Sequence, residues 1–196
     1  MAEVSFPIKK TVTYAILLYM GTIKGLFIKI QIDHLKHLKG EGVLKQLTDF
    51  YGKPLEFTSF KDYPTADEEK ILQGCVHILE PDTATSDLAY KSGHYHLNVF
   101  LNSPYGMTLL KAAPRDIKKA LSYASVALRP VLSDVEIRYA DTGERSATVT
   151  LKNSGYSLDH FRGMWDEIFS YFTENVTITV TATQLSPTDQ EYRFNW

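Results

Sequence analysis

Histidines come nearest to forming a metal site in this chain, which contains six of them. His34 and His37 stand three apart in an expected helix and can share one face, whereas His94 and His96 can share a face only in an extended segment. No repeat of aspartate or glutamate accompanies either pair to complete a four-ligand site. We therefore expect histidines at the surface or at helix ends, and no bound metal.

Nucleophilic catalysis needs an activated serine or cysteine, and neither has the expected surroundings here. The chain has no Gly-x-Ser-x-Gly turn, and its single cysteine, Cys75, stands beside Val76 and near Leu72 and Leu79 on an expected helix face. These neighbours predict a buried structural thiol. Three consecutive acids, residues 67–69, would suit acid–base chemistry, but the dipole at a helix N-terminus already accounts for them. Since no glycine-rich phosphate loop is present either, we expect a protein that is not an enzyme.

Aromatic residues are the feature most compatible with ligand binding, because the chain has twelve tyrosines and ten phenylalanines. Five of them could line an apolar pocket with a few polar tips: Phe57, Phe60, Tyr63, Tyr95 and Phe100. The same positions would also suit an ordinary hydrophobic core. Both interpretations stay open at this point.

Charge and composition limit the range of partners and locations. With 21 basic and 23 acidic residues interspersed, the formal net charge is −2, and no basic stripe follows a phosphate backbone, so we expect no nucleic-acid partner. One cysteine cannot form an internal disulfide and no secretory signal pattern is present, which predicts a cytoplasmic protein. Lys24, Lys29 and Gln31 interrupt the apolar run at residues 12–32, so no membrane span is expected.

A single domain of 196 residues is expected, with a helical half to about residue 130, since no linker or repeat divides the chain. Residues 11–20 fit either a strand or a helix. Helices are predicted at residues 22–39, ending at Gly40, and at residues 43–50, ending at Gly52. A third helix is predicted from Thr65, with a capping box to Glu68, and a fourth from a cap at Ser86 or Asp87, interrupted or bent at Gly93. A fifth is predicted from Pro114 to about residue 128, before Pro130.

The remaining part, about residues 131–196, has the pattern of a ββαββ unit. Two alternating runs, residues 134–139 and 146–151, flank a glycine-containing turn. Residues 158–172 are apolar at helical spacing, and residues 176–180 and 192–196 predict two further strands. We therefore predict an α+β fold in which a helical N-terminal half packs on a twisted, mainly antiparallel C-terminal sheet.

Short motifs spread over most of the chain carry a resemblance to a known superfamily. They are Ile23-Lys-Gly-Leu-Phe27, Phe60-Lys-Asp-Tyr-Pro64, Ser103-Pro-Tyr-Gly106, Ala113-Pro-Arg115, residues 156–172 and Tyr192-Arg-Phe-Asn-Trp196. With the order of elements, they resemble the superfamily of haem-nitric-oxide-binding (H-NOX) domains, 4-vinyl-reductase-like ligand-binding domains and transport-particle subunits of Golgi traffic. Within it, the chain is most similar to an uncharacterised paralogous family expanded in myxobacteria.

The resemblance raises the question of haem, because H-NOX domains hold the haem propionates with a Tyr-x-Ser-x-Arg motif. Here Tyr123-Ala-Ser125 is followed by Arg129 at a different spacing, and residues 152–156, where the motif is expected, contain no arginine to pair a propionate. His94 and His96 are the candidates for a proximal histidine, but they lie in no matching segment. We expect no haem and no other cofactor.

The resemblance implies a non-enzymatic sensory or regulatory domain that binds a small, mainly apolar ligand between its helices and its sheet. Such a ligand would favour one packing of the helices over another and so change a partner-binding surface. Two alternatives stay open. One is a ligand-free protein-interaction module that forms homodimers or binds another protein, similar to the transport-particle subunits, and the other is a haem-based gas sensor.

Overall fold

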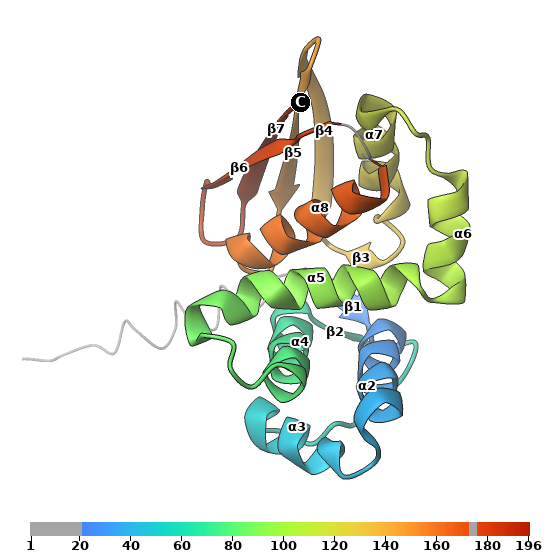
Figure 1. Ribbon diagram of the computed structural model, residues 1–196, viewed down its shortest axis with the longest axis vertical. Helices are drawn as coiled ribbons and strands as arrows, with labels where there is room; N and C mark the ends of the chain where they lie inside the picture. Colours follow the sequence, from blue (N-terminus) through green and yellow to red (C-terminus); the bar gives the residue numbers. More distant parts are fainter. Residues whose placement is uncertain (1–20, 173–175) are drawn as a thin grey trace, which may run out of the picture.

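The computed structural model describes residues 21–172 and 176–196. The segment at residues 11–20, left open between helix and strand, lies outside the described residues. Helices fill the first part of the chain and an antiparallel four-stranded sheet the last part, which confirms the predicted α+β fold (Figure 1). None of the helices in the described part has both the length and the apolar character of a membrane-spanning segment.

One long central helix, α5 (Leu88–Leu101), runs between two groups of elements. On one side lie α2 (Gly25–Lys39), α3 (Val43–Tyr51) and α4 (Thr65–Leu79), and on the other lie α8 (Leu158–Phe172) and the large sheet (Figure 1). A short 3₁₀ turn, Thr85–Asp87, leads into α5, and α6 (Pro104–Ala112) and α7 (Ile117–Ala127) follow it. α2 and α3 end at Gly40 and Gly52, as predicted.

The first predicted helix begins later than expected. Residues Thr22–Lys24 form strand β1, which pairs on one side with β2 (Asp62–Pro64) and on the other with β3 (Leu132–Ser133). Ile23 is fully buried, so it fits the apolar spacing of the helix that follows, but its backbone is held extended by these two partners. The helix therefore starts at Gly25.

Three further helix starts differ from the predictions in detail. α4 begins at Thr65, but without a capping box, because Thr65 Oγ1 donates to the Gly21 carbonyl at 3.0 Å and Glu68 turns into the core. α5 is continuous through Gly93 and has no side-chain cap. α7 begins after Asp116, whose carboxylate accepts from the Lys119 amide, and not at Pro114.

The C-terminal sheet has the strand order β4-β5-β7-β6, with every neighbouring pair antiparallel. Its strands are β4 (Glu136–Gly143), β5 (Ser146–Lys152), β6 (Thr179–Gln184) and β7 (Gln190–Asn195). The register places Val149 opposite both Tyr139 and Tyr192, and Ala147 opposite Phe194, so these side chains share one face of the sheet. That face forms the core, as the ββαββ pattern predicts.

Helix α8 covers this face. The Trp165 ring lies 5.2 Å from the Phe194 ring and 6.2 Å from the Tyr192 ring, and the Phe161 ring lies 6.1 Å from that of Tyr192. Aromatic rings at these separations pack edge-on or tilted and add to the burial of apolar area. The predicted packing of residues 158–172 on the strands is therefore present.

α5 and α8 cross at close range because a glycine lies on each helix at the crossing. A Cβ atom on Gly93 would overlap the His160 carbonyl oxygen, and one on Gly163 would overlap the Tyr90 carbonyl oxygen. Only a residue without a side chain fits at either position. This explains the glycine that the sequence suggested as a break in α5.

Candidate functional site

A partly enclosed, strongly apolar cavity of about 60 Å³ lies between α5, α6, α7 and α8. Its walls are almost entirely carbon, and they are formed by Leu97, Phe100, Leu101, Leu109, Leu110, Ala113, Ala120, Tyr123, Ala124, Ala127, Leu128, Phe161, Met164, Trp165 and Ile168. The inner wall consists of buried residues of α5 and α8, such as Leu97 and Phe161. Leu109 and Leu110 of α6, in the outer wall, are partly exposed. The cavity thus has a fixed inner wall and a thin outer one.

Helix α6 is held mainly at its start. Ser103 Oγ accepts from the Gly106 amide at 3.1 Å and donates to the Phe100 carbonyl at 2.6 Å, which fixes the turn between α5 and α6. Gly106 is the only buried residue of the helix. A helix with so little buried surface can move at low cost compared with the core elements. The outer wall of the cavity is therefore its movable wall.

A second void of about 20 Å³ continues the cavity toward the interior. The two voids share Leu97, Phe100, Leu128, Phe161 and Met164 in their linings, and the smaller one is closed by His96 and Tyr156 among others. At this inner end the apolar cavity meets a chain of buried polar groups.

This buried polar chain runs from Ser92 through His160 and His96 to Glu68 and Tyr156. Ser92 Oγ uses its one proton to donate to the Ala89 carbonyl, so it accepts from His160 Nδ1 at 2.8 Å. Because His160 is then protonated on Nδ1, its Nε2 accepts from His96 Nδ1 at 3.1 Å. His96 Nε2 faces Glu68 Oε1 at 3.8 Å, and the Tyr156 hydroxyl donates to the other Glu68 oxygen. The donor and acceptor roles of Ser92, His160 and His96 follow from one another, whereas Glu68 Oε1 has no hydrogen-bond partner within the described residues.

Burial keeps the members of this chain uncharged near neutral pH. It lowers the pKa of His96 to about 4 and that of His160 well below its usual value. It raises the pKa of Glu68 to about 8, although the hydrogen bond from Tyr156 acts in the opposite direction. Burial also raises the pKa of neighbouring Glu69, which accepts from the Ser157 amide at 2.6 Å. Neutral hydrogen bonds therefore join His96 of α5 to His160 of α8, and Glu68 of α4 to Tyr156, just before α8.

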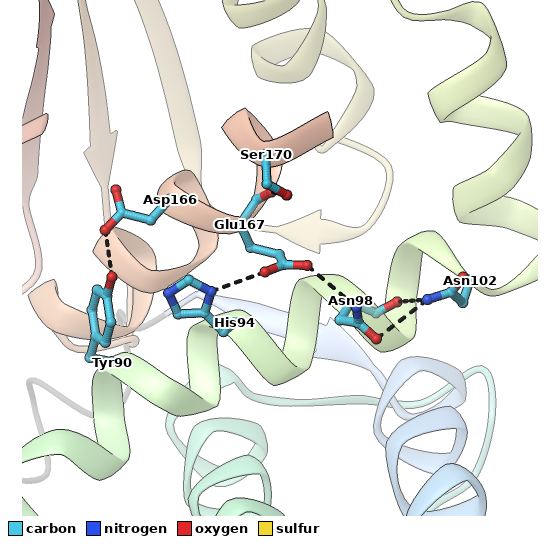
Figure 2. A network of polar contacts seen from close by, with 7 residues as sticks. All are labelled: Tyr90, His94, Asn98, Asn102, Asp166, Glu167 and Ser170. Atoms are coloured by element: carbon cyan, nitrogen blue, oxygen red, sulfur yellow. Dashed lines mark hydrogen bonds and ion pairs between the residues drawn. The ribbon is translucent and has the colours of Figure 1, made fainter. Parts of the chain in front are cut away.

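A second set of contacts, the α5–α8 clasp, joins these helices at their exposed edge (Figure 2). Tyr90 donates to Asp166 at 2.6 Å, and Glu167 of α8 contacts His94 at 3.0 Å and accepts from Asn98 at 3.3 Å. Because the clasp and the glycine crossing lie on the same helix pair, α5 and α8 form a rigid unit. The inner wall of the cavity belongs to this unit.

The structure distributes the five predicted pocket residues over several places. Phe100 alone among them lines the apolar cavity, and its ring lies 6.1 Å from that of Phe27. Phe57 and Tyr63 contact each other at 4.9 Å in the helical half, far along the chain from the cavity residues. Tyr95 lines a separate, open groove of about 440 Å³ that the clasp residues also line. Phe60 is 86% exposed.

Sequence reasoning missed most of the cavity, and one signal could have found it. Ala120, Ala124 and Ala127 recur at helical spacing on α7 and all line the cavity. A stripe of alanines facing leucines and aromatics leaves space that larger side chains would fill. The leucines of α6 carried no such signal, because the helix itself was not predicted.

The histidines and the cysteine considered for metal binding and catalysis are explained by their places in the fold. His96 and His160 are buried, so the expectation of surface or helix-end histidines is wrong for His96. No group of three or more His, Cys, Asp or Glu within the described ranges is arranged to hold a metal ion. Cys75 is buried as predicted, and burial raises the pKa of its thiol to about 12, which leaves it unreactive at neutral pH.

Solved structures with a similar fold are H-NOX domains. The Fe(II) unliganded H-NOX protein from K. algicida is 17% identical, with a TM-score of 0.60 over 88% of this chain and 96% of that chain. An H-NOX protein from S. oneidensis in the Fe(II)NO ligation state is 13% identical, with a TM-score of 0.55 over 88% and 98% of the two chains. At such low identity the likeness shows the fold, and it confirms the predicted H-NOX-like architecture.

The family of the chain follows from its sequence. A family model described as a protein of unknown function (DUF2378) matches residues 17–196, so the chain belongs to this family. No curated protein matches the sequence.

The residues present do not fit haem, the group that the fold family implies. In the present packing of α6, a void of about 60 Å³ is smaller than the engineered cavity of about 150 Å³ that holds a single benzene ring, so it does not hold a porphyrin. No histidine, cysteine or arginine lines the cavity. His96, the histidine nearest to it in the linings, has Nδ1 bonded to His160 and Nε2 facing Glu68. The cavity lining thus offers neither a histidine or cysteine axial ligand nor a basic partner for a propionate.

Proposed function

We propose that this protein is a non-enzymatic sensory or regulatory domain that binds a small, mainly apolar molecule in the cavity between α5, α6, α7 and α8. The observation that carries the proposal is the carbon-lined cavity itself, with a buried inner wall and an outer wall that has little buried surface. Ligand pockets combine an apolar lining with few polar groups, as this one does. Of the five residues predicted for the pocket, Phe57, Phe60, Tyr63, Tyr95 and Phe100, the proposed site includes Phe100.

Signalling in this proposal runs through α6. The cavity is too small for a ligand of more than a few heavy atoms unless α6 moves outward, so a bound molecule favours an outer position of the helix. Partly exposed residues of α6, among them Tyr105 and Met107, then present a different surface to a partner protein. The relationship to a paralogous family expanded in myxobacteria, which the sequence motifs imply, stays a prediction.

A methyl-detected NMR titration with 2-methyl-1-octene, a slender apolar probe, tests the proposal. Methyl signals of Leu109, Met164 and Ile168 are expected to shift, whereas those of residues in α3 are expected to stay. Ala124→Met fills the cavity and should weaken binding about tenfold or more, since its side chain occupies the space of the probe. Val126→Met, on the same helix but 57% exposed, is the matched control and should bind like the wild type.

Two results would count against this function. Either the probe shifts no cavity methyl group at its solubility limit, or Ala124→Met and Val126→Met bind it equally well. Native mass spectrometry of the purified protein adds a direct search for a retained ligand. Reconstitution with haem is expected to give no Soret band, and a Soret band would favour the gas-sensor alternative.

A homodimerisation module is the second candidate, and an exposed apolar pair favours it. Leu26 is 42% exposed and Phe60 is 86% exposed, and the Leu26 amide donates to the Ser59 carbonyl, so both side chains start from adjacent backbone. Exposed apolar groups that lie together commonly mark an interface. Light scattering over a range of concentrations tests this candidate, and a mass that stays monomeric throughout would contradict it.

A further inference from the structure

Trp165 has a buried hydrogen-bond donor with no acceptor. The residue is 3% exposed and lines the apolar cavity, and its indole Nε1 has no hydrogen-bond partner within the described part of the chain. A buried donor without an acceptor costs about 1–3 kcal/mol, and almost all such groups in folded proteins are paired. A phenylalanine would fill similar space without this cost. The indole N–H therefore needs an explanation.

The surroundings of the indole on the protein side offer no acceptor. Its ring neighbours there are Phe169, Phe194 and Tyr192, and no acceptor among the described residues, the Tyr192 hydroxyl oxygen included, forms a hydrogen bond with Nε1. The indole also lines the cavity, whose lining side chains are otherwise carbon except for the Met164 sulfur and the hydroxyl of the partly exposed Tyr123. A molecule that enters the cavity as α6 moves outward is then the source left for the missing acceptor.

We propose that the ligand is an apolar molecule with one uncharged hydrogen-bond acceptor, such as a ketone, aldehyde or ester carbonyl, which accepts from Nε1 of Trp165. This inference rests on the proposed function and names the class of its ligand. The acceptor is uncharged because no lysine, arginine or histidine lines the cavity, and a buried carboxylate without a cation is far more costly than a buried carbonyl. The remainder of the ligand is apolar because the rest of the lining is almost entirely carbon, with the partly exposed Tyr123 as the other residue that carries a hydrogen-bond donor in its side chain.

A pair of probes of matched shape tests the acceptor. 2-Octanone and 2-methyl-1-octene differ by the exchange of a carbonyl oxygen for a methylene group, and octanoate adds a charged head. In the wild type, octanoate is expected to bind more weakly than 2-octanone. In Trp165→Phe, the affinity for 2-octanone should fall about tenfold, which equals about 1.4 kcal/mol, while the affinity for 2-methyl-1-octene stays within about twofold.

The indole signals of the wild type give a readout that needs no variant. The chain has two tryptophans, Trp165 and Trp196, so a ¹⁵N–¹H spectrum shows two indole signals. The Trp165 indole proton should move downfield with 2-octanone but not with 2-methyl-1-octene, while the Trp196 signal serves as the internal reference. If Trp165→Phe fails to fold, this comparison in the wild type still shows whether the carbonyl accepts from the Trp165 indole N–H.

The outcomes separate this inference from the proposed function. If both probes bind in the cavity but the Trp165 indole proton responds equally to them, the acceptor is wrong and the apolar cavity stands. Tighter binding of octanoate than of 2-octanone would overturn the uncharged head group. If neither neutral probe binds, the inference and the proposed function fall together.

Discussion

Glu68 is a carboxyl group with no exposed surface, and it takes its hydrogen bond from Tyr156 instead of from water. Burial raises its pKa to about 8, and burial lowers the pKa of His96, which faces it at 3.8 Å, to about 4. Between these values the two groups are neutral and do not form an ion pair. A neutral pair avoids the large cost of placing two charges in an apolar interior.

The raised pKa of Glu68 has a measurable consequence for stability. Above the usual pKa of a glutamate, 4.5, the folded state retains a proton that the unfolded chain has released, so the stabilisation is complete below that value and is lost as the pH rises toward 8. From pH 7 to 8 this loss amounts to about 1 kcal/mol. Urea unfolding of the wild type is expected to show this decrease in the free energy of unfolding between pH 7 and 8, and Glu68→Gln is expected to show a smaller decrease.

The control for this prediction is Glu144→Gln, in the exposed turn between β4 and β5, which should keep the wild-type pH dependence. The histidines do not disturb the measurement, because lowered pKa values leave His96 and His160 neutral in the folded state, and an unfolded histidine titrates mainly below pH 7. An equal slope between pH 7 and 8 for Glu68→Gln and the wild type would show that Glu68 is ionised in the folded protein.

At the scale of elements, the crossing of α5 and α8 depends on two glycines. A Cβ atom on Gly93 meets backbone atoms of His160 and Met164, and backbone cannot move aside as a flexible side chain can. Gly93→Ala is therefore expected to lower the free energy of unfolding by about 3 kcal/mol, as overpacking does, despite the better helix propensity of alanine.

Gly42→Ala is the matched control for the crossing, because Gly42 precedes α3 with helical backbone angles and nothing lies near its missing Cβ. It should change the free energy of unfolding by no more than about 0.5 kcal/mol. Urea denaturation of both variants checks the prediction. A Gly93→Ala variant as stable as Gly42→Ala would mean that the two helices are further apart than described.

Elements with regular apolar spacing could be predicted from the sequence, and those fixed by distant partners could not. The ββαββ unit and the helix ends at Gly40 and Gly52 rest on local signals. β1 is extended only because β2 and β3 pair with it from residues far along the chain. Ser103-Pro-Tyr-Gly106 carries the start signals of α6, a capping serine followed by proline, but the short helix has no strong apolar stripe.

The candidate site shows the same division. Cys75 could be predicted as buried because its sequence neighbours are apolar. Glu68 and Glu69 have all the features of a helix N-terminus in the sequence, and their burial follows only from the approach of Tyr156 and Ser157, 88 residues away in both pairs. The cavity likewise arises where four helices meet, so it cannot be predicted from the pattern of any single segment.

For the whole molecule, the central question is whether the helical half and the sheet fold together. One continuous cluster of buried residues extends from Ile28 and Leu35 of α2 to Val149 and Tyr192 of the sheet. α5 contributes to both sides, and the buried polar chain ties it to α4 as well as to α8. A core shared in this way predicts a single cooperative unfolding transition for the described chain.

Two natural probes report on the two halves separately. Cys75 in α4 is buried with a raised pKa, so a thiol reagent modifies it only after the helical half opens, whereas Trp165 and Trp196 report by fluorescence on α8 and the sheet. Brief thiol labelling and tryptophan fluorescence, followed in the same urea series, are expected to give one midpoint. Because α5 packs on both halves, opening the helices around Cys75 removes the support of α8, and the fluorescence must change with it. Labelling of Cys75 at a lower urea concentration, with the fluorescence unchanged, would instead divide the chain into two folding units and place the cavity at their boundary.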